Sequence, residues 1–197
     1  MSVIKFNPQT RLLLVFIAAI AAIRVVLNFN DEISPLANFS PVGAMAIFGG
    51  AYFNRQWKAF VFPLLMLFLS DLVLQQTVFK AHGNGILYGG WYWVYGAFVL
   101  MTFAARWLLR ELTIKSFILS VLVCVFIHWI ITDIGIWDGS HIFPQNLRGY
   151  IECLITAIPY EWRFLAGTLV YGIILFGLFE WIRQRYPLLE TVKPNVE

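Results

Sequence analysis

Six long apolar segments dominate this sequence of 197 residues. Most of them approach the ~20 residues that an α-helix needs to cross the hydrocarbon core of a bilayer. The predicted helices cover approximately residues 11–27, 41–54, 58–75, 91–109, 114–133 and 161–182. The second segment is the shortest and is rich in small residues. The pattern predicts an all-α membrane protein, in which a bundle of six transmembrane helices forms one domain over residues 1–197.

The composition indicates that lipid is the main solvent of this chain. Hydrophobic residues make up 60% of it, charged residues 13%, and the mean hydropathy is +0.74. A soluble domain carries about 25% charged residues, so this chain has too few to cover a water-soluble globule. Disorder, a disulfide scaffold and an ordinary cytosolic enzyme are therefore excluded. The first apolar segment has no clear cleavage site and is interpreted as a retained helix rather than a signal peptide.

Basic residues gather beside the short connections between the predicted helices. The short connections are residues 54–57 and 110–113, and the long loops are residues 28–40, 76–90 and 134–160. Ten Lys and Arg residues lie near the termini and the short connections, three lie on the side of the long loops, and Arg24 lies within the first helix. This bias predicts cytoplasmic termini and outward long loops in a bacterial-type cytoplasmic membrane. It explains the net positive charge without nucleic-acid binding.

The long loops and the helix ends beside them carry the side chains best suited to bind a ligand. Loops of this length are usually functional in a compact protein, and three on one face would form a lid over a cavity. In the last loop, residues 147–158 are predicted to form a short amphipathic helix on the membrane surface, ended by Pro159. The candidate ligand-binding residues are Asn30, Asp71, His82, Asn84, Tyr88, Trp91, Trp137, Arg148, Tyr160 and Arg163.

Several candidates have a structural interpretation beside the functional one. An acid within a span is costly, so Asp71 is expected to face the protein interior or a wet cavity, either as an anchor for a ligand or as a helix-end carboxylate paired with a loop donor. Arg24 could pair with Asp71 or with the acids of the first loop, or extend to the interface. Arg148 and Arg163 could hold substrate carboxylates through forked hydrogen bonds, but Arg148 is also placed to pair with Glu152 one helical turn away.

The sequence contains no recognisable metal-binding or catalytic motif, and neither Gly-x-Ser-x-Gly nor His-Glu-x-x-His occurs. Cys124 and Cys153 are not spaced as a metal or redox pair. His82 could be the axial ligand of a metal inside a bound cofactor, although a solvated loop histidine is the simpler interpretation.

An intramembrane enzyme remains as an alternative function. His128, Thr132 and Asp133 share roughly one face of the fifth predicted helix. They could relay a proton or act as a base for a serine such as Ser70, although catalysis would also need an oxyanion hole. A purely structural or assembly protein is the third hypothesis.

Ala18 and Ala22 form a small-xxx-small pair on the first predicted helix. Such a face allows close approach of another helix in lipid. Internal packing is one interpretation of this face, and docking of a partner membrane subunit is the other.

Residues 38–53, Asn-Phe-Ser-Pro-Val-Gly-Ala-Met-Ala-Ile-Phe-Gly-Gly-Ala-Tyr-Phe, resemble the signature of a family of predicted transport proteins. Residues 69–72, residues 149–160 and the pair Phe176–Gly177 are similar to further motifs of that family. The matches span roughly residues 24–177. Six helices, inward termini, three outward loops and an Ala-x-x-x-Ala first helix also resemble the S-components of energy-coupling-factor vitamin transporters, to which the family is related.

This resemblance implies an S-component-like fold with a vitamin-like molecule held under the three long loops. Solitary cobalamin-transporting S-components are the nearest type, so a corrinoid such as cobalamin is the lead ligand, with no required cofactor and no catalytic residue. Asp71, Tyr88 and Arg163 occupy motif-like positions, and Asn30 is a weaker candidate. In the cobalamin carriers a cysteine of the third loop can bind cobalt, whereas this sequence has only His82 there. The resemblance also implies an energy-coupling membrane subunit as the partner of the first helix.

Overall fold

The computed structural model describes residues 8–28, 38–53, 56–77 and 86–185. These residues form six α-helices. The helices are α1 (Pro8–Asn28), α2 (Val42–Tyr52), α3 (Gln56–Thr77), α4 (Trp91–Leu108), α5 (Ile114–Trp137) and α6 (Leu147–Arg185). The prediction of an all-α fold is confirmed for this part of the chain, and the six predicted segments each correspond to one helix.

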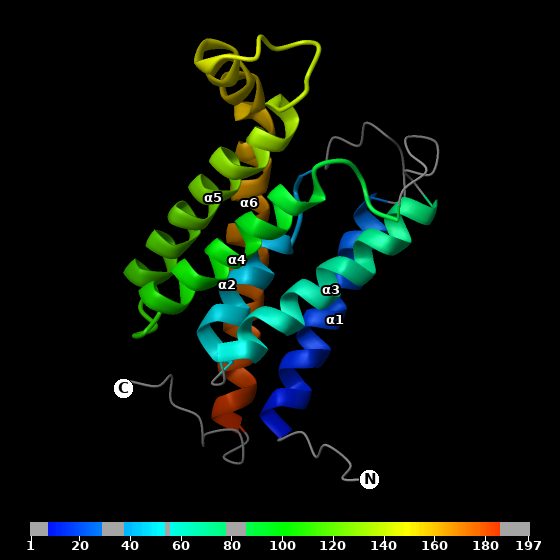
Figure 1. Ribbon diagram of the computed structural model, residues 1–197. Helices are drawn as coiled ribbons and strands as arrows, with labels where there is room; N and C mark the ends of the chain where they lie inside the picture. Colours follow the sequence, from blue (N-terminus) through cyan, green and yellow to red (C-terminus); the bar gives the residue numbers. More distant parts are fainter. Residues whose placement is uncertain (1–7, 29–37, 54–55, 78–85, 186–197) are drawn as a thin grey trace.

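The helices alternate in direction along the chain (Figure 1). α1, α3 and α5 begin at the lower end of the molecule in this view, and α2, α4 and α6 begin at its upper end. We define the upper end by the ends of α1, α3 and α5 and the starts of α2, α4 and α6. The three connections predicted to be long therefore join helix ends at the upper end, and the two short connections join helix ends at the lower end.

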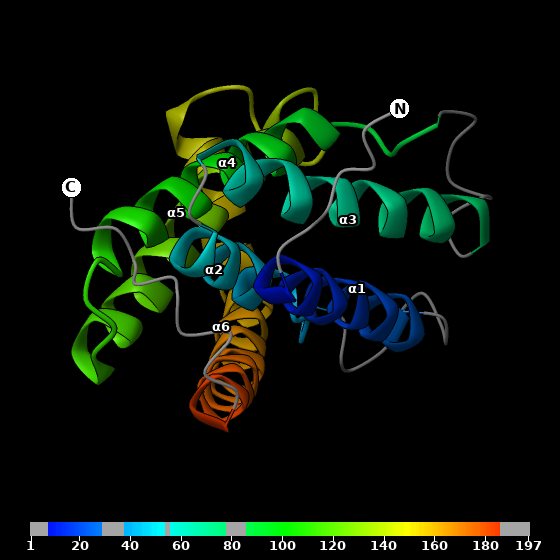
Figure 2. The same cartoon turned by 90° about the horizontal axis from the view of Figure 1, so that it is seen from below.

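Helix α2 lies at the centre of the molecule and contacts every other helix (Figure 2). Ten of its 11 residues are buried. Glycines allow this close packing, because a Cβ atom at Gly43 would lie 2.2 Å from Thr168 of α6 and one at Gly49 would lie 2.5 Å from Pro63 of α3. The small residues of the second predicted helix thus permit three neighbouring helices to approach one short segment.

The outer faces of the longer helices are apolar. Phe126 of α5 and Ile173 of α6 expose 60% and 63% of their surfaces, and Phe103 of α4 exposes 63%. Among the described residues, three helices are long and apolar enough to cross a membrane: Trp57–Thr77, Ile114–Trp137 and Leu147–Arg185. These features are consistent with an integral membrane protein.

Helix α2 is too short to cross a bilayer by itself. Its 11 residues rise by about 17 Å at 1.5 Å per residue, whereas the hydrocarbon core is about 30 Å thick. α4 is longer, but Trp, Tyr and Arg106 lower its hydropathy. Helix α2 is thus surrounded by protein rather than by lipid. In α4, polar residues interrupt the apolar run.

The predicted helix break at Pro159 is wrong. α6 runs without interruption over 39 residues and contains Pro159, so residues 147–158 are the first turns of α6 rather than a separate helix on the membrane surface. Proline removes one backbone hydrogen bond, but contacts with α5 hold the segment in place. Trp129 donates to the Leu154 carbonyl at 3.1 Å, and Tyr150 donates to the Ile130 carbonyl at 2.5 Å.

Helix α5 also extends beyond its predicted end, from residue 133 to Trp137. Its start carries a capping box, in which Thr113 accepts a hydrogen bond from the Ser116 backbone and the Ser116 side chain accepts one from Thr113. Past its end, Gly139 has a φ of +72°, a conformation that favours glycine and turns the chain toward α6. The last predicted loop is consequently reduced to residues 138–146.

Candidate functional site

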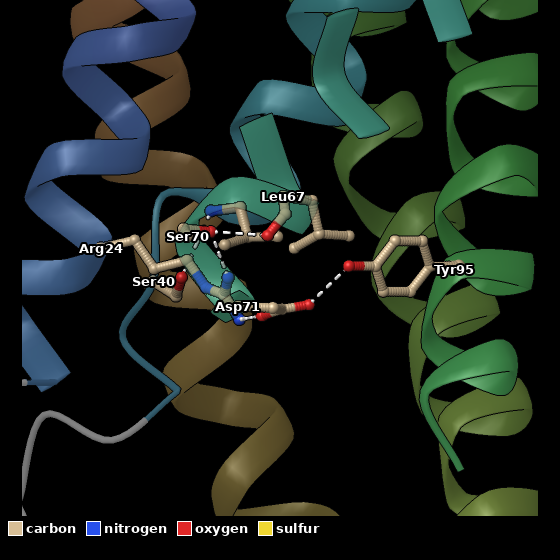
Figure 3. A network of polar contacts seen from close by, with 7 residues as sticks. Arg24, Ser40, Leu67, Ser70, Asp71 and Tyr95 are labelled. Carbon is tan, nitrogen blue, oxygen red and sulfur yellow. Dashed lines mark hydrogen bonds and ion pairs between the residues drawn. The ribbon is translucent and has the colours of Figure 1, made fainter. Parts of the chain in front are cut away.

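A buried ion pair joins α1 to α3 below the upper end (Figure 3). Arg24 Nη2 of α1 lies 2.6 Å from Asp71 Oδ1 of α3, and the Asp71 side chain is only 1% exposed. Arg24 Nη1 also donates to Ser70 Oγ at 2.5 Å, and Ser70 Oγ donates to the Leu67 carbonyl at 2.8 Å. The structure therefore confirms the predicted pairing of Arg24 with Asp71, whereas the acids of the first loop, Asp31 and Glu32, lie outside the described residues.

Helix α4 adds aromatic residues to this ion pair. The Tyr95 hydroxyl donates to Asp71 Oδ2 at 2.8 Å, so both carboxylate oxygens of Asp71 have partners. Trp91 packs edge-on against Tyr95 with ring centroids 5.4 Å apart and is 42% exposed. Burial raises the pKa of Tyr88, in the segment before α4, and the nearby Asp71 charge raises it further. Tyr88 is therefore a neutral hydrogen-bond donor beside the carboxylate.

We call Arg24, Ser70, Asp71, Tyr88 and Tyr95 the polar cluster. It connects α1, α3 and the start of α4, which are far apart in the sequence. Arg24 is four residues from the end of α1, Asp71 is six residues from the end of α3, and Tyr95 is in the second turn of α4. The polar cluster therefore lies about 6–9 Å below the upper ends of α1 and α3, at 1.5 Å per residue.

The polar cluster is a buried network rather than a surface salt bridge. An ionised carboxylate in a dry interior is tolerated only when it is paired and hydrogen-bonded, and Asp71 meets both conditions. Arg24 keeps 16% of its side chain exposed. A charge, hydroxyl groups and an exposed indole thus lie together near the upper end, where they can orient a ligand that is otherwise held by apolar contacts.

Four predicted site residues of α5 and α6 have other contacts. Trp137 donates to the Pro144 carbonyl at 2.9 Å and packs on Tyr150, so it closes the turn between the two helices. Arg148 pairs with Glu152 at 3.0 Å and is 87% exposed, which is the structural alternative for this arginine. Arg163 and Tyr160 form an exposed pair, with the guanidinium 5.8 Å from the ring centroid.

Three other predicted site residues, Asn30, His82 and Asn84, lie outside the described residues. The proposed contact of His82 with a cofactor metal therefore stays a prediction. In the part of the chain that the structure describes, no three His, Cys, Asp or Glu side chains gather as a metal site.

A second polar cluster lies between α5 and α6. His128 Nδ1 is 3.0 Å from Glu161 Oε1, and the His128 ring stacks on Phe164 with centroids 4.0 Å apart. Asp133, one turn further along α5, is 2% exposed, and its Oδ2 atom has no hydrogen-bond partner. Ser70 does not join these residues through any described hydrogen bond, because it bonds Arg24 and the Leu67 carbonyl.

A buried polar atom without a partner also occurs on α4. Trp93 packs so tightly on α5 that a Cβ atom at Gly135 would lie 2.8 Å from its ring, and its indole Nε1 has no partner. Trp93 is the third residue of α4 and Asp133 is four residues from the end of α5. Unsatisfied buried groups are rare in native proteins and call for water, an ion or a ligand. Trp93 and Asp133 both lie near the upper end.

Sequence reasoning missed two residues of these clusters. Tyr95 follows Trp91 by four positions, so one helical turn places the two rings on the same face; that spacing was the available signal. Glu161 as the partner of His128 had no local signal, because 33 residues separate them and only the packing of α6 against α5 brings them together.

The described residues define an all-helical protein with three helices long and apolar enough to cross a membrane and with a buried ion pair near one end. The chain belongs to the family of unknown function DUF6580, which matches residues 4–189. No curated protein and no solved structure matches the chain. The resemblance to S-components therefore stays a prediction from the sequence motifs.

Proposed function

We propose that this protein is a membrane transporter, or the substrate-binding component of one, that takes up a vitamin-like small molecule. The polar cluster is the floor of the binding site, and the long connections at the upper end cover the ligand. A corrinoid is the lead candidate because of the resemblance to cobalamin-transporting S-components. No step of this function requires a catalytic nucleophile or a resident cofactor.

The buried Arg24–Asp71 pair is the observation that carries this proposal. Stability alone does not explain an ion pair in the interior of a membrane protein, because apolar side chains of similar size often replace such a pair with little loss of stability. Ionisable residues within membrane helices mark substrate or ion pathways by default. Here the pair is joined by Tyr95 and lies beside the exposed Trp91.

The orientation in the membrane follows from the distribution of basic residues. Seven of the ten described Lys and Arg residues lie at or near the lower helix ends: Arg11, Lys58, Arg106, Arg110, Lys115, Arg183 and Arg185. The positive-inside rule then assigns the lower end to the cytoplasm and the upper end to the outside. All six helices would cross or enter the bilayer, with α2 packed in the protein interior.

Binding is tested by replacing Tyr95. The ligand is first identified by mass spectrometry of small molecules that co-purify from native membranes, with cobalamin added as the first probe. Tyr95→Phe keeps the ring and removes one hydroxyl group. Loss of this buried hydrogen-bond donor is expected to cost about 1–3 kcal/mol of binding free energy, which corresponds to about 5- to 150-fold in Kd.

The matched control for that measurement is Tyr92→Phe. Tyr92 lies on the same helix but is 54% exposed, and its replacement is expected to leave Kd unchanged. Equal affinity of the Tyr95→Phe variant and the wild type would remove the polar cluster from the binding site. Three results together would identify the protein as an assembly factor: no small molecule co-purifies, cobalamin does not bind, and a protein partner co-purifies in stoichiometric amount. Such a partner would be expected on Ala18 and Ala22, which are exposed on α1.

Topology is tested by cysteine labelling of intact cells. Cys124 and Cys153 are both buried, so they give little background. His141→Cys places a thiol in the exposed connection at the upper end, and Glu111→Cys places one at the lower end. A membrane-impermeant maleimide is expected to label the first variant in intact cells and the second only after permeabilisation. Labelling of both variants, or the reverse pattern, would overturn the assignment of the upper end to the outside.

An intramembrane enzyme is the second candidate function, and the His128–Glu161 contact is the observation that favours it. A carboxylate that orients a histidine is a common arrangement for a general base. His128→Ala separates the two functions. Loss of turnover with intact ligand binding would support the enzyme, whereas unchanged binding and unchanged uptake would leave His128 a packing residue of the α5–α6 interface.

A further inference from the structure

Two adjoining cavities open at the lower end of the molecule, away from the polar cluster. The first has a volume of about 400 Å³ and lies between the start of α5 and the lower half of α6; it is lined mainly by apolar residues, among them Phe117, Ile118, Ile173, Phe176 and Gly177. The second has a volume of about 350 Å³ and is lined by the polar residues Tyr52, Glu180, Arg183 and Gln184 together with the apolar residues Ala51, Leu109 and Leu112. Leu112 and Glu180 line both, so the two cavities adjoin each other.

The apolar cavity has the form of a groove that faces lipid. Ile118 and Ile173, on its two sides, are 46% and 63% exposed, and Phe117 and Phe176 pack edge-on at its floor with centroids 5.2 Å apart. Along α6 it runs from Leu169 to Glu180. Eleven residues of helix rise by about 17 Å, close to half of the ~30 Å hydrocarbon core. The groove therefore has the length of one leaflet.

The polar cavity at the end of this groove contains charges of both signs. Glu180 Oε1 accepts a hydrogen bond from the Tyr52 hydroxyl at 2.6 Å, and Glu180 Oε2 lies 2.8 Å from Arg183 Nη2. The Glu180 and Arg183 side chains are 23% and 30% exposed, so both remain accessible. A carboxylate has about four acceptor positions and a guanidinium has five donors. Each group therefore has hydrogen-bonding capacity beyond the contacts described.

We propose that these two adjoining cavities together bind a phospholipid with a phosphoethanolamine headgroup. One acyl chain lies in the groove, the phosphate binds Arg183, and the primary ammonium group binds Glu180. The charges on the protein are complementary to this zwitterion. A choline headgroup lacks N–H donors for Glu180, and an anionic glycerol headgroup lacks the cation. The charged residues lie about 17 Å from the far end of the groove. This length is close to the distance from the middle of the bilayer to the lipid headgroups.

The site is tested with the full-length protein in detergent by native mass spectrometry. Phosphatidylethanolamine, phosphatidylcholine and phosphatidylglycerol with the same acyl chains are added separately. The wild type is expected to retain phosphatidylethanolamine most strongly, by about tenfold in affinity over phosphatidylcholine, the change expected from one hydrogen bond between charged groups. Glu180→Gln is expected to abolish this preference.

Gly177→Leu tests the groove separately from the headgroup site. Gly177 lines the groove, and a Cβ atom there meets nothing within 4 Å, so a leucine side chain can begin in open space at the groove. It is expected to remove the tightly retained lipid. The matched control is Gly96→Leu on α4, where a Cβ atom also meets open space, and it is expected to keep the lipid. Circular dichroism and gel filtration establish that both variants fold.

Three results would overturn the proposal. Equal retention of the three lipids by the wild type would indicate annular lipid only. Retention by Gly177→Leu equal to that of Gly96→Leu would place the lipid elsewhere. Loss of a dimer or of a bound protein subunit in Gly177→Leu, without loss of lipid, would identify the groove as a protein interface. None of these results depends on uptake of a vitamin-like molecule, so they leave the proposed function untouched.

Discussion

Replacing Arg24 with Leu is expected to destabilise the protein by about 3–5 kcal/mol, because it leaves the Asp71 carboxylate buried without its cation. Asp71 exposes 1% of its side chain, so water cannot replace the lost partner. Native proteins are stable by only about 5–15 kcal/mol, so the variant should lose a large share of its stability. The measurement is denaturant unfolding in detergent micelles, followed by tryptophan fluorescence.

A double variant separates the cost of an unpaired charge from the value of the pair. Arg24→Leu/Asp71→Leu removes both charges and is expected to recover most of the lost stability, because apolar residues of similar volume often replace a buried ion pair without loss. Its recovery should be incomplete, since Tyr95 then loses its acceptor. The double variant is expected to recover stability but not ligand binding. This difference separates the binding role of the polar cluster from its structural role.

The control for this experiment is Arg148→Leu. Arg148 also pairs with an acid, at 3.0 Å from Glu152, but its side chain is 87% exposed. Exposed pairs of this kind contribute about 0–1 kcal/mol. If Arg24→Leu costs no more than Arg148→Leu, the ion pair between α1 and α3 is not buried in the folded protein.

Replacing Gly50 with Ala is expected to destabilise the protein through a clash between two backbones. A Cβ atom at Gly50 of α2 would lie 2.6 Å from the Thr102 carbonyl oxygen and 3.0 Å from the Arg106 nitrogen of α4. Backbone atoms cannot rotate away as a flexible side chain does, so α2 and α4 must separate. Overpacking of this kind costs about 1–3 kcal/mol, and the same unfolding measurement reports it.

Gly96→Ala provides a control with the opposite sign. Gly96 lies in α4, and a Cβ atom there meets nothing within 4 Å. Alanine in a helix interior is more favourable than glycine by about 0.5–1 kcal/mol, so this variant should be slightly more stable than the wild type. Equal stabilisation by both substitutions would show that helix propensity rather than the close α2–α4 contact governs the result, and it would contradict the packing at Gly50.

Much of the fold was predictable because each helix carries its own apolar run. The boundaries of α3 and α4 differ from prediction by two residues or fewer. Pro159 was the clearest failure. Proline usually ends a helix. Here Trp129 of α5 donates to α6 and Tyr150 of α6 donates to α5, and these two contacts hold the part of α6 before Pro159 in place. Those contacts connect residues 20 or more positions apart and leave no local trace in the sequence.

The candidate site was predictable only in part. Asp71 was identified because an acid in an apolar run is costly wherever the run lies, and Tyr88 and Trp91 because they adjoin a glycine-rich segment beside it. Arg148 and Arg163 were chosen for their charge on the side of the long loops, and Arg163 also for its motif-like position; the structure leaves both exposed on α6. Charge in the sequence does not indicate whether a side chain will be buried.

The amino-acid sequence by itself determined that the chain is helical, that its surface is suited to lipid and that basic residues concentrate at one end. Hydrophobic periodicity, length and charge are local properties, and these conclusions depend on nothing else. Only the tertiary structure decided which polar residues meet. Arg24 reaches Asp71 across 47 positions, and Tyr95 reaches Asp71 across 24. Which of several possible partners a buried charge obtains depends on how α1, α3 and α4 pack around α2, where glycines set the distances between helices.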